Sequence, residues 1–86
     1  MKRPTSNITE ILFTLIRNRR VSLHDFPYLA GFRTRVSELK TEYGLELKTD
    51  RVQSKNKFNN PYTFVVHSLP QSERDKAVEL YNKLVG

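Results

Sequence analysis

The sequence predicts a single α+β domain in which three helices precede a two-stranded β-hairpin and a further helix ends the chain. Apolar residues recur at helical spacing in the first half, alternate with polar residues after Gly44, and return to helical spacing near the C-terminus. A chain of 86 residues is long enough for one hydrophobic core and too short for two. One domain of mixed class is therefore expected.

The first helix is expected to follow Asn7 and to end near Arg17–Asn18. Asn7 is predicted to cap it, because Glu10 stands three residues later and completes a capping-box pattern. The helix should end near Arg17, where a cation meets the negative end of the helix dipole. Its apolar residues form one stripe: Ile8, Ile11, Leu12, Leu15 and Ile16.

A connector and a short second helix follow. Residues 19–21 are too few for more than a connector or a single bridge of strand. Ser22 offers a cap for a helix over 23–29, in which Pro27 must lie near the N-terminal end because proline lacks the N–H donor. Gly31 then permits a tight turn, since glycine adopts positive φ without steric cost.

The third helix is expected over residues 32–43, and two signals predict it: an apolar stripe and a glycine after its end. Apolar residues recur every three or four positions, at Phe32, Val36, Leu39 and Tyr43. Gly44 follows at the position where a capping glycine belongs.

Two strands are expected after this helix. Apolar and polar residues alternate over 45–50 and again over 62–67. Residues 51–61 between them are polar and rich in Asn and Lys, and 59–61 carry a turn signal. We therefore expect a hairpin with a protruding, cationic tip.

The C-terminal segment, residues 70–86, is expected to form a helix capped by Ser68 or Ser72. Two roles remain open for its apolar stripe. It folds back onto the core, or it stays exposed and mediates dimerisation, so that both a monomer and a homodimer are compatible with the sequence. The stripe consists of Ala77, Val78, Tyr81, Leu84 and Val85.

Charge is the most informative property of the composition. Fifteen Lys and Arg against nine Asp and Glu give a net charge of +6, which favours a polyanionic partner, most often nucleic acid. Residues 1–35 carry a net charge of +5 and residues 51–67 carry +3 without any acid, whereas residues 36–50 carry −2. Two basic blocks thus flank a mixed segment.

Other classes are excluded or disfavoured. Without cysteine the chain has neither a disulfide scaffold nor a Cys-ligated zinc site, and His24 and His67 lack metal-ligand spacing. Three scattered glycines do not form a phosphate-binding loop, and neither His has an identifiable nucleophile beside it. We expect no metal, no cofactor, no catalytic residue and no enzymatic activity. The longest apolar run is three residues, so we also expect no membrane contact and a cytoplasmic location.

A short helix, a glycine-containing turn, a capped helix and a hairpin occur here in that order. Across residues 7–69 the chain resembles the winged helix-turn-helix family. The stretch FRTRVSELKTEYGLELKT is similar to the recognition helix and first wing strand of small phage and bacterial helix-turn-helix proteins. The resemblance implies that helix 32–43 enters the major groove of double-stranded DNA and that the hairpin is the wing. The resemblance implies little about residues 70–86, because the fourth helix varies in that family.

Candidate DNA contacts follow from the helical geometry. The side of helix 32–43 opposite the apolar stripe, with its flank, presents Arg33, Thr34, Ser37, Lys40 and Thr41. Arginine binds guanine bidentately, and short hydroxyls allow close approach to a base or a phosphate. The alternative is an ordinary solvated face, and Glu38 argues mildly against DNA.

Further candidates lie outside this helix. Arg51, Lys55 and Lys57 in the hairpin suit contacts to phosphates or the minor groove. Phe58 is expected to fold back under the hairpin, with contact to a sugar or base as the alternative. Arg19 and Arg20, with Arg17, either contact phosphates or cap the carbonyls at the end of the first helix. Residues 1–6, with Lys2 and Arg3, are expected to be a flexible basic arm.

The predicted function is sequence-specific binding of double-stranded DNA, in transcription regulation or as an accessory factor of a phage or mobile element. Two alternatives stay open. A winged-helix module could bind a protein of host machinery or inhibit a defence protein, as the acid cluster Glu38, Glu42, Glu46 and Asp50 suggests. RNA binding would use Tyr28, Phe58 or Tyr62 for stacking on bases without a pairing partner.

Overall fold

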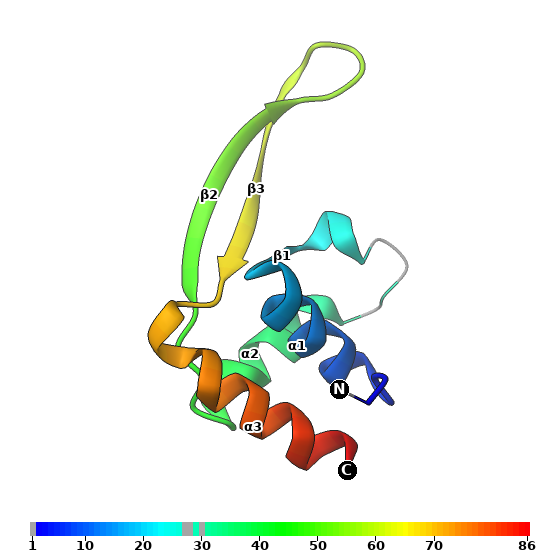
Figure 1. Ribbon diagram of the computed structural model, residues 1–86. Helices are drawn as coiled ribbons and strands as arrows, with labels where there is room; N and C mark the ends of the chain where they lie inside the picture. The colour runs from blue at the N-terminus through cyan, green and yellow to red at the C-terminus, as the bar shows by residue number, and fades with distance from the viewer. Residues whose placement is uncertain (1, 27–28, 30) are drawn as a thin grey trace.

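The computed structural model describes residues 2–26, 29 and 31–86 of the chain. Within these residues three α-helices accompany a three-stranded antiparallel sheet of order β1-β3-β2. The elements are α1 (Asn7–Asn18), β1 (Arg20–Ser22), the 3₁₀ helix η1 (Leu23–Asp25), α2 (Phe32–Thr41), β2 (Lys48–Lys55), β3 (Pro61–Ser68), the 3₁₀ helix η2 (Gln71–Glu73) and α3 (Arg74–Val85). The α-helices gather at one end of the molecule, and the β2–β3 hairpin projects away from them (Figure 1).

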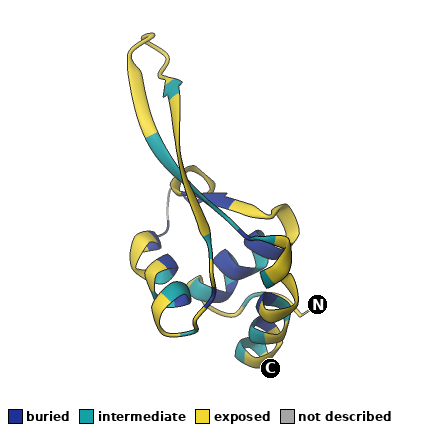
Figure 2. Ribbon diagram, turned by 90° about the vertical axis from the view of Figure 1, so that its left-hand side faces the viewer, coloured by how far each residue is buried: buried dark blue, intermediate teal, exposed yellow. Residues whose placement is uncertain are grey.

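The sheet has three strands only at its base. β1 pairs with the end of β3, from Arg20 opposite Ser68 to Ser22 opposite Val66. β2 pairs with β3 along its whole length, from Lys48 opposite Ser68 to Lys55 opposite Pro61. The outer part of the hairpin is therefore a two-stranded ribbon, exposed on most of its surface (Figure 2), and the molecule measures 44 × 26 × 21 Å.

The core lies between the three α-helices and the base of the sheet. α3 packs against α1, where the rings of Phe13 and Tyr81 have centroids 5.6 Å apart. The Tyr81 side chain is completely buried and its Oη donates to the Lys2 carbonyl. The other buried apolar residues are Ile11, Leu12, Leu15, Ile16, Val21, Phe26, Leu29, Phe32, Val36, Leu39, Leu45, Leu69 and Ala77.

The cap of α1 differs from the prediction. Ser6, not Asn7, is the N-cap, with extended backbone angles (φ −152°, ψ 169°). Thr9 completes the capping box in place of Glu10: its hydroxyl accepts from the Ser6 N–H at 2.9 Å, and the Ser6 Oγ accepts from the Thr9 N–H at 3.4 Å. Asn7 is the first residue of the helix, whose bounds and apolar stripe are otherwise as predicted.

The predicted second helix over 23–29 is wrong in its extent. Helical structure stops at Asp25, and Phe26 has φ −134° and ψ 57°, outside the helical region. The sequence supplies the reason, because a residue that precedes proline is disfavoured in the α conformation. The Ser22 N–H does donate to Asp25 at 2.8 Å, as the predicted cap pair requires. Residues 27, 28 and 30 lie outside the described residues.

The prediction for α2 is confirmed within two residues. Gly31 has φ 76° at its start, and the helix ends at Thr41 rather than at residue 43. Gly44 has φ 65°, and the Leu45 N–H donates to the Leu39 carbonyl at 2.9 Å, which closes the C-terminus in a Schellman motif.

The strands are displaced along the chain relative to the prediction. The protruding hairpin is present, but β2 begins at Lys48, not at residue 45, and continues to Lys55. Leu45 is buried and Leu47 is partly buried, so both pack against the core before the strand starts. Their alternation reflects the packing of the connection after α2. The polar residues up to Lys55 are held in the strand by the ladder with β3.

The C-terminal helix is present, but neither predicted serine caps it. Pro70 precedes η2, and Glu73 precedes α3. Of the predicted stripe, Ala77 and Tyr81 are fully buried, while Val78, Leu84 and Val85 are partly buried against the core. Within this chain the stripe folds back, and Tyr81 is not available to a second copy.

Candidate nucleic-acid interface

The outer face of α2 is open to solvent. Phe32, Val36 and Leu39 are buried and fix the rotation of the helix about its axis. The predicted contact residues on the other side are exposed, namely Arg33, Thr34, Ser37 and Thr41, whereas Lys40 is half-buried. α3 packs against α1, and the exposure of Arg33, Thr34 and Ser37 shows that this face of α2 is uncovered.

Two of these side chains are engaged within the protein. The Thr41 hydroxyl donates to the Ser37 carbonyl at 2.9 Å, and Lys40 Nζ donates to Thr49 Oγ1 at 3.0 Å. Among the described residues the one ion pair joins Arg35 to Glu38 at 3.2 Å, which neutralises the carboxylate that argued against DNA. The N-terminal half of α2, with Arg33, Thr34 and Ser37, is therefore the part best placed to receive a ligand.

A groove of about 380 Å³ separates α2 from β3. Its lining consists of Arg33, Val36, Ser37, Lys40, Val65 and His67. The alternation of apolar and polar residues over 62–67 predicts that His67 points outward from its strand, but it is half-buried on the sheet face that looks toward α2. This correction depends on the strand register, because His67 pairs with Val21 of the core on one side and with Thr49 on the other.

A chain of hydrogen bonds crosses this groove. Lys40 Nζ donates to Thr49 Oγ1, so the Thr49 hydroxyl proton is free to donate to His67 Nδ1, which lies 3.2 Å away. In the neutral tautomer that carries its proton on Nε2, His67 accepts this bond at Nδ1. Burial lowers the pKa of His67 below its ordinary value, and the nearby positive charge of Lys40 lowers it further.

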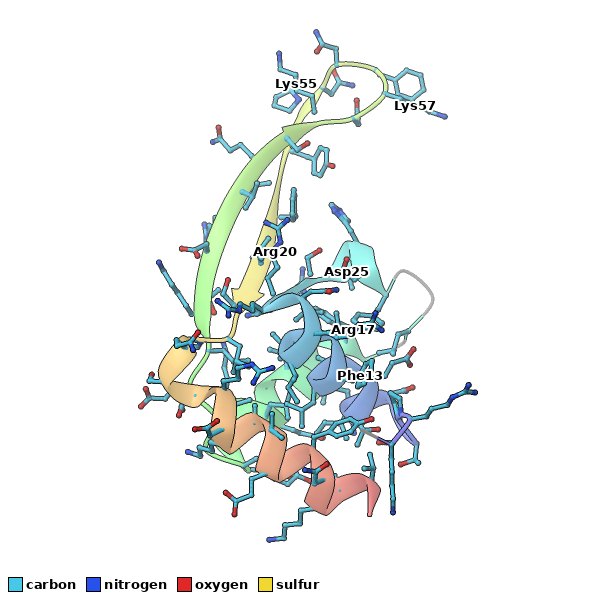
Figure 3. The ribbon with its side chains drawn as sticks, viewed as in Figure 1. Phe13, Arg17, Arg20, Asp25, Lys55 and Lys57 are labelled. Atoms are coloured by element: carbon cyan, nitrogen blue, oxygen red, sulfur yellow. The ribbon has the colours of Figure 1, made fainter. Side chains whose placement is uncertain are left out.

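Two of the three predicted hairpin contacts, Arg51 and Lys55, lie on one face of the sheet. Arg51 pairs with Val65 and Lys55 pairs with Pro61, so both share the face of His67, which looks toward α2. Both are exposed, as is Lys57 in the connecting loop. Lys55 and Lys57 stand at the tip, far from the helices (Figure 3). Arg51 and Lys55 thus share the hairpin face of His67, and Lys57 stands in the loop beyond the strands.

The tip itself differs from the prediction. Phe58 does not fold back under the hairpin: its side chain is 71% exposed. The Asn56 side chain accepts from the Phe58 N–H at 2.9 Å and from the Asn60 N–H at 3.0 Å, and so holds the loop in place. Sequence reasoning missed this role of Asn56, although an Asn at the start of a loop is a known signal for such bonds.

Arg19 and Arg20 are not brought to the same side. Arg20 pairs with Ser68, so its side chain belongs to the sheet face opposite His67. Arg19 takes the left-handed conformation (φ 66°) at the end of α1, and its carbonyl accepts from the Leu69 N–H at 2.7 Å. The Arg17 guanidinium lies 5.8 Å from the Phe13 ring centroid on α1 (Figure 3).

An aromatic cluster beside the hairpin was not predicted. The His24 ring lies 4.4 Å from that of Phe64 and 5.9 Å from that of Tyr62, centroid to centroid. Leu23 and Tyr62 next to it are 45% and 37% exposed. The alternation of residues along the strand predicts that Tyr62 and Phe64 share one face of the hairpin. His24 reaches them because η1 lies beside β3, and no local sequence pattern indicates that packing.

Comparison with protein-family models, with curated proteins and with solved structures finds no match to this chain. Over residues 2–26, 29 and 31–86, no group of three or more His, Asp or Glu side chains could hold a metal ion. No helix in the described part of the chain has the length and apolar character needed to cross a membrane.

Proposed function

We propose that this chain is a winged helix-turn-helix protein that binds double-stranded DNA in a sequence-specific manner. In this proposal α2 enters the major groove and the β2–β3 hairpin is the wing. The observation that carries it is the open N-terminal half of α2, with Arg33, Thr34 and Ser37 exposed on the side away from the core. The order of elements and the β1-β3-β2 sheet are compatible with a winged-helix arrangement.

The chemistry of α2 suits base recognition. In helix-turn-helix docking the N-terminal part of the recognition helix meets the base edges. Arg33 has the fork of donors that matches guanine O6 and N7, a contact that discriminates by about 1–3 kcal/mol. Thr34 and Ser37 are short enough to allow the helix backbone to approach the groove. Sequence preference is therefore assigned to these three residues.

The hairpin supplies affinity without sequence preference. Arg51, Lys55 and Lys57 are exposed cations on an arm that no acidic residue interrupts between residues 51 and 67. Contacts from such side chains to phosphates release condensed counterions and strengthen binding to every sequence. In this proposal α2 recognises the sequence and the hairpin binds the backbone. Such a protein acts in transcription control, or in excision or replication of a phage or mobile element, inside a bacterial cytoplasm.

The proposal is tested by selecting bound duplexes from a random pool and measuring affinity for the recovered site. Arg33→Ala is expected to weaken binding to that site by about 5–150-fold, equivalent to 1–3 kcal/mol, and to relax the preference at one base position. Ser37→Ala should reduce affinity for the same site. Lys83→Ala, which removes an exposed charge from α3, is the control and should change neither affinity nor preference. Arg33→Ala with unchanged affinity and preference would contradict the role of α2.

The exposed cluster around Leu23, His24 and Tyr62 favours a second candidate, a winged-helix module that binds a protein. Apolar side chains rimmed by polar groups are typical of protein interfaces. This candidate predicts that the random pool yields no common motif and that duplex binding disappears at moderate salt. RNA binding is separated by competition, because an RNA-binding protein would prefer single-stranded RNA over the selected duplex.

A further inference from the structure

The loop at the tip of the hairpin presents one aromatic ring to solvent. Lys57 and Phe58 are the two central residues of a turn closed by a bond from the Asn59 N–H to the Asn56 carbonyl at 2.9 Å. Phe58 is 71% exposed, more than the other large apolar side chains that stand out from the described surface. Its neighbour in the turn, Lys57, stands at the tip of the hairpin, far from the helices (Figure 3).

This loop is ordered by its own hydrogen bonds. Asn59 adopts φ 64°, and the Asn56 N–H donates to the Asn60 carbonyl at 3.0 Å, so the turn is followed by a residue in the left-handed conformation. Such three-residue hairpin loops are a common and stable type. The two bonds to the Asn56 side chain fasten the loop further. Phe58 is thus held outward by a defined backbone, and inserting the ring elsewhere costs little further conformational entropy.

The arm is long enough to carry the ring into a groove. Beyond the last residue pair shared with β1, Ser22 opposite Val66, β2 and β3 continue for five more pairs. These pairs extend the ribbon by about 17 Å at about 3.3 Å per residue. The minor groove of B-DNA is only about 7.5 Å deep.

The charge around the ring directs it toward a polyanion. Lys57 Nζ lies 5.2 Å from the centroid of the Phe58 ring, and Lys55 ends the preceding strand. Proteins that insert a side chain into the minor groove combine cations that attract the phosphates with an apolar group that unstacks the bases. The Phe58 ring with its neighbouring lysines has both features.

We propose that Phe58 inserts into the minor groove as a wedge between two base pairs and bends the duplex that α2 binds. This inference rests on the proposed function, and it adds a DNA-bending activity to it. Lys55 and Lys57 contact the phosphates on either side, while the ring separates one base step and opens the minor groove there. The bend is directed toward the major groove, by roughly 20–90° as for other wedge residues.

The experiment measures bending and binding separately on the selected duplex. Bending is followed by energy transfer between dyes at the two ends, and unstacking is followed by 2-aminopurine placed at successive steps. The variants are Phe58→Ala, Phe58→Leu and, as the matched control, Val52→Ala, which shortens another exposed apolar side chain of the hairpin. Asn56→Ala tests whether the ordered loop is needed.

The wild type and Phe58→Leu are expected to bend the duplex, because leucine retains an apolar wedge. Phe58→Ala should abolish the bend and the 2-aminopurine signal, with a smaller decrease in affinity than Arg33→Ala, since the cost of unstacking also disappears. Val52→Ala should bend the duplex like the wild type. Asn56→Ala should bend it less.

Four outcomes overturn the inference. A duplex bound in an Arg33-dependent manner without bending, or bent equally by Phe58→Ala, leaves the proposed function standing and removes the wedge. If Phe58→Ala lowers the affinity for single-stranded nucleic acid and leaves the affinity for the duplex unchanged, Phe58 stacks on unpaired bases instead. Failure of the wild type to bind any duplex removes both the proposed function and the wedge.

Discussion

His67 of β3 is connected to α2 through the hydroxyl of Thr49 in β2. Its Nδ1 lies 3.2 Å from Thr49 Oγ1, which in turn accepts from Lys40 of α2 at 3.0 Å. Protonation of His67 would place a second positive charge near Lys40. Burial and the charge of Lys40 both lower the pKa of His67, in that order.

This arrangement predicts a dependence of stability on pH. In the unfolded chain His67 binds a proton near its ordinary pKa of about 6.5, whereas the folded protein resists that proton. The stability contributed by the neutral imidazole is present above about pH 6.5 and is lost as the pH falls through the lower pKa of the folded state. Thermal unfolding between about pH 7.5 and about pH 5 should show this decrease in the wild type and a smaller one in His67→Gln.

Two variants separate the causes of the lowered pKa. Lys40→Met is expected to raise the pKa of His67, measured by NMR titration, because it removes the neighbouring charge and leaves the burial. His24→Gln removes an imidazole outside this hydrogen-bonded chain and should retain the decrease in stability at acid pH. An equal decrease in His67→Gln and the wild type would contradict the assignment.

The end of α2 shows how one backbone conformation positions a whole element. Gly44 takes φ 65°, the Leu45 N–H bonds back to Leu39, and Lys76 Nζ of α3 donates to the Gly44 carbonyl at 2.6 Å. η2 holds the same segment, because the Glu73 carboxylate accepts from the Glu46 N–H at 2.9 Å. The turn after α2 is therefore tied to the C-terminal helix, which leaves the outer face of α2 open.

Gly44→Ala is expected to destabilise the protein by about 1–2 kcal/mol, because the left-handed conformation brings a Cβ close to the backbone carbonyl. An added Cβ would lie 3.7 Å from Lys76 Nζ, an ordinary contact, so the cost comes from the backbone alone. Urea unfolding measures it. Glu42→Ala, at an exposed residue two positions earlier with ordinary helical angles, is the control and should stay within about 0.5 kcal/mol of the wild type.

Elements with complete local signals could be predicted from the sequence. α2 has a stripe, a positive-φ glycine before it and another after it, and its bounds are within two residues of the prediction. The second helix could not be predicted as well, because the spacing of Leu23, Phe26 and Leu29 does not come from a helix: Phe26 and Leu29 are buried, Leu23 is exposed, and a turn ends the helical structure before Pro27. The predicted start of β2 was wrong because Leu45 alternates with Leu47 like a strand residue while it closes the preceding helix.

Some residues of the candidate site could be predicted from the sequence and others could not. Helical geometry alone predicts that Arg33, Thr34 and Ser37 share an exposed face. The positions of Phe58 and His67 could not be predicted, because they depend on the hydrogen bonds of one loop and on the register of strands far apart in sequence. Long-range pairing is not encoded in any short window of residues.

At the scale of the whole molecule, the part that extends from the core is also a basic part. The packed helices form one end, and the hairpin extends from them to give a longest dimension of 44 Å (Figure 1). The hairpin carries Arg51, Lys55 and Lys57 without a carboxylate between residues 51 and 67. The proposed function therefore places a large share of the phosphate contacts on a part of the protein that adds nothing to the core.

The double variant Lys55→Ala with Lys57→Ala should weaken binding to all duplexes and lower the slope of log affinity against log salt by about 0.9 for each phosphate that the variant no longer neutralises. Folding stability should remain near the wild-type value, because both side chains are exposed outside the core. The charge-matched control is Arg74→Ala with Lys83→Ala on α3, which should keep the slope. An unaltered slope in the hairpin variant would count against phosphate contacts by the wing.

The position of β2 at the edge of the sheet has a consequence for solubility. Its outer row of N–H and C=O groups, from Lys48 to Lys55, has no neighbouring strand in the described part of this chain and could template the addition of another one. Lysine and arginine along such a margin repel a second copy and keep it from joining. The cations assigned to nucleic acid thus also guard against self-association, and replacing them with valine or isoleucine should favour aggregation.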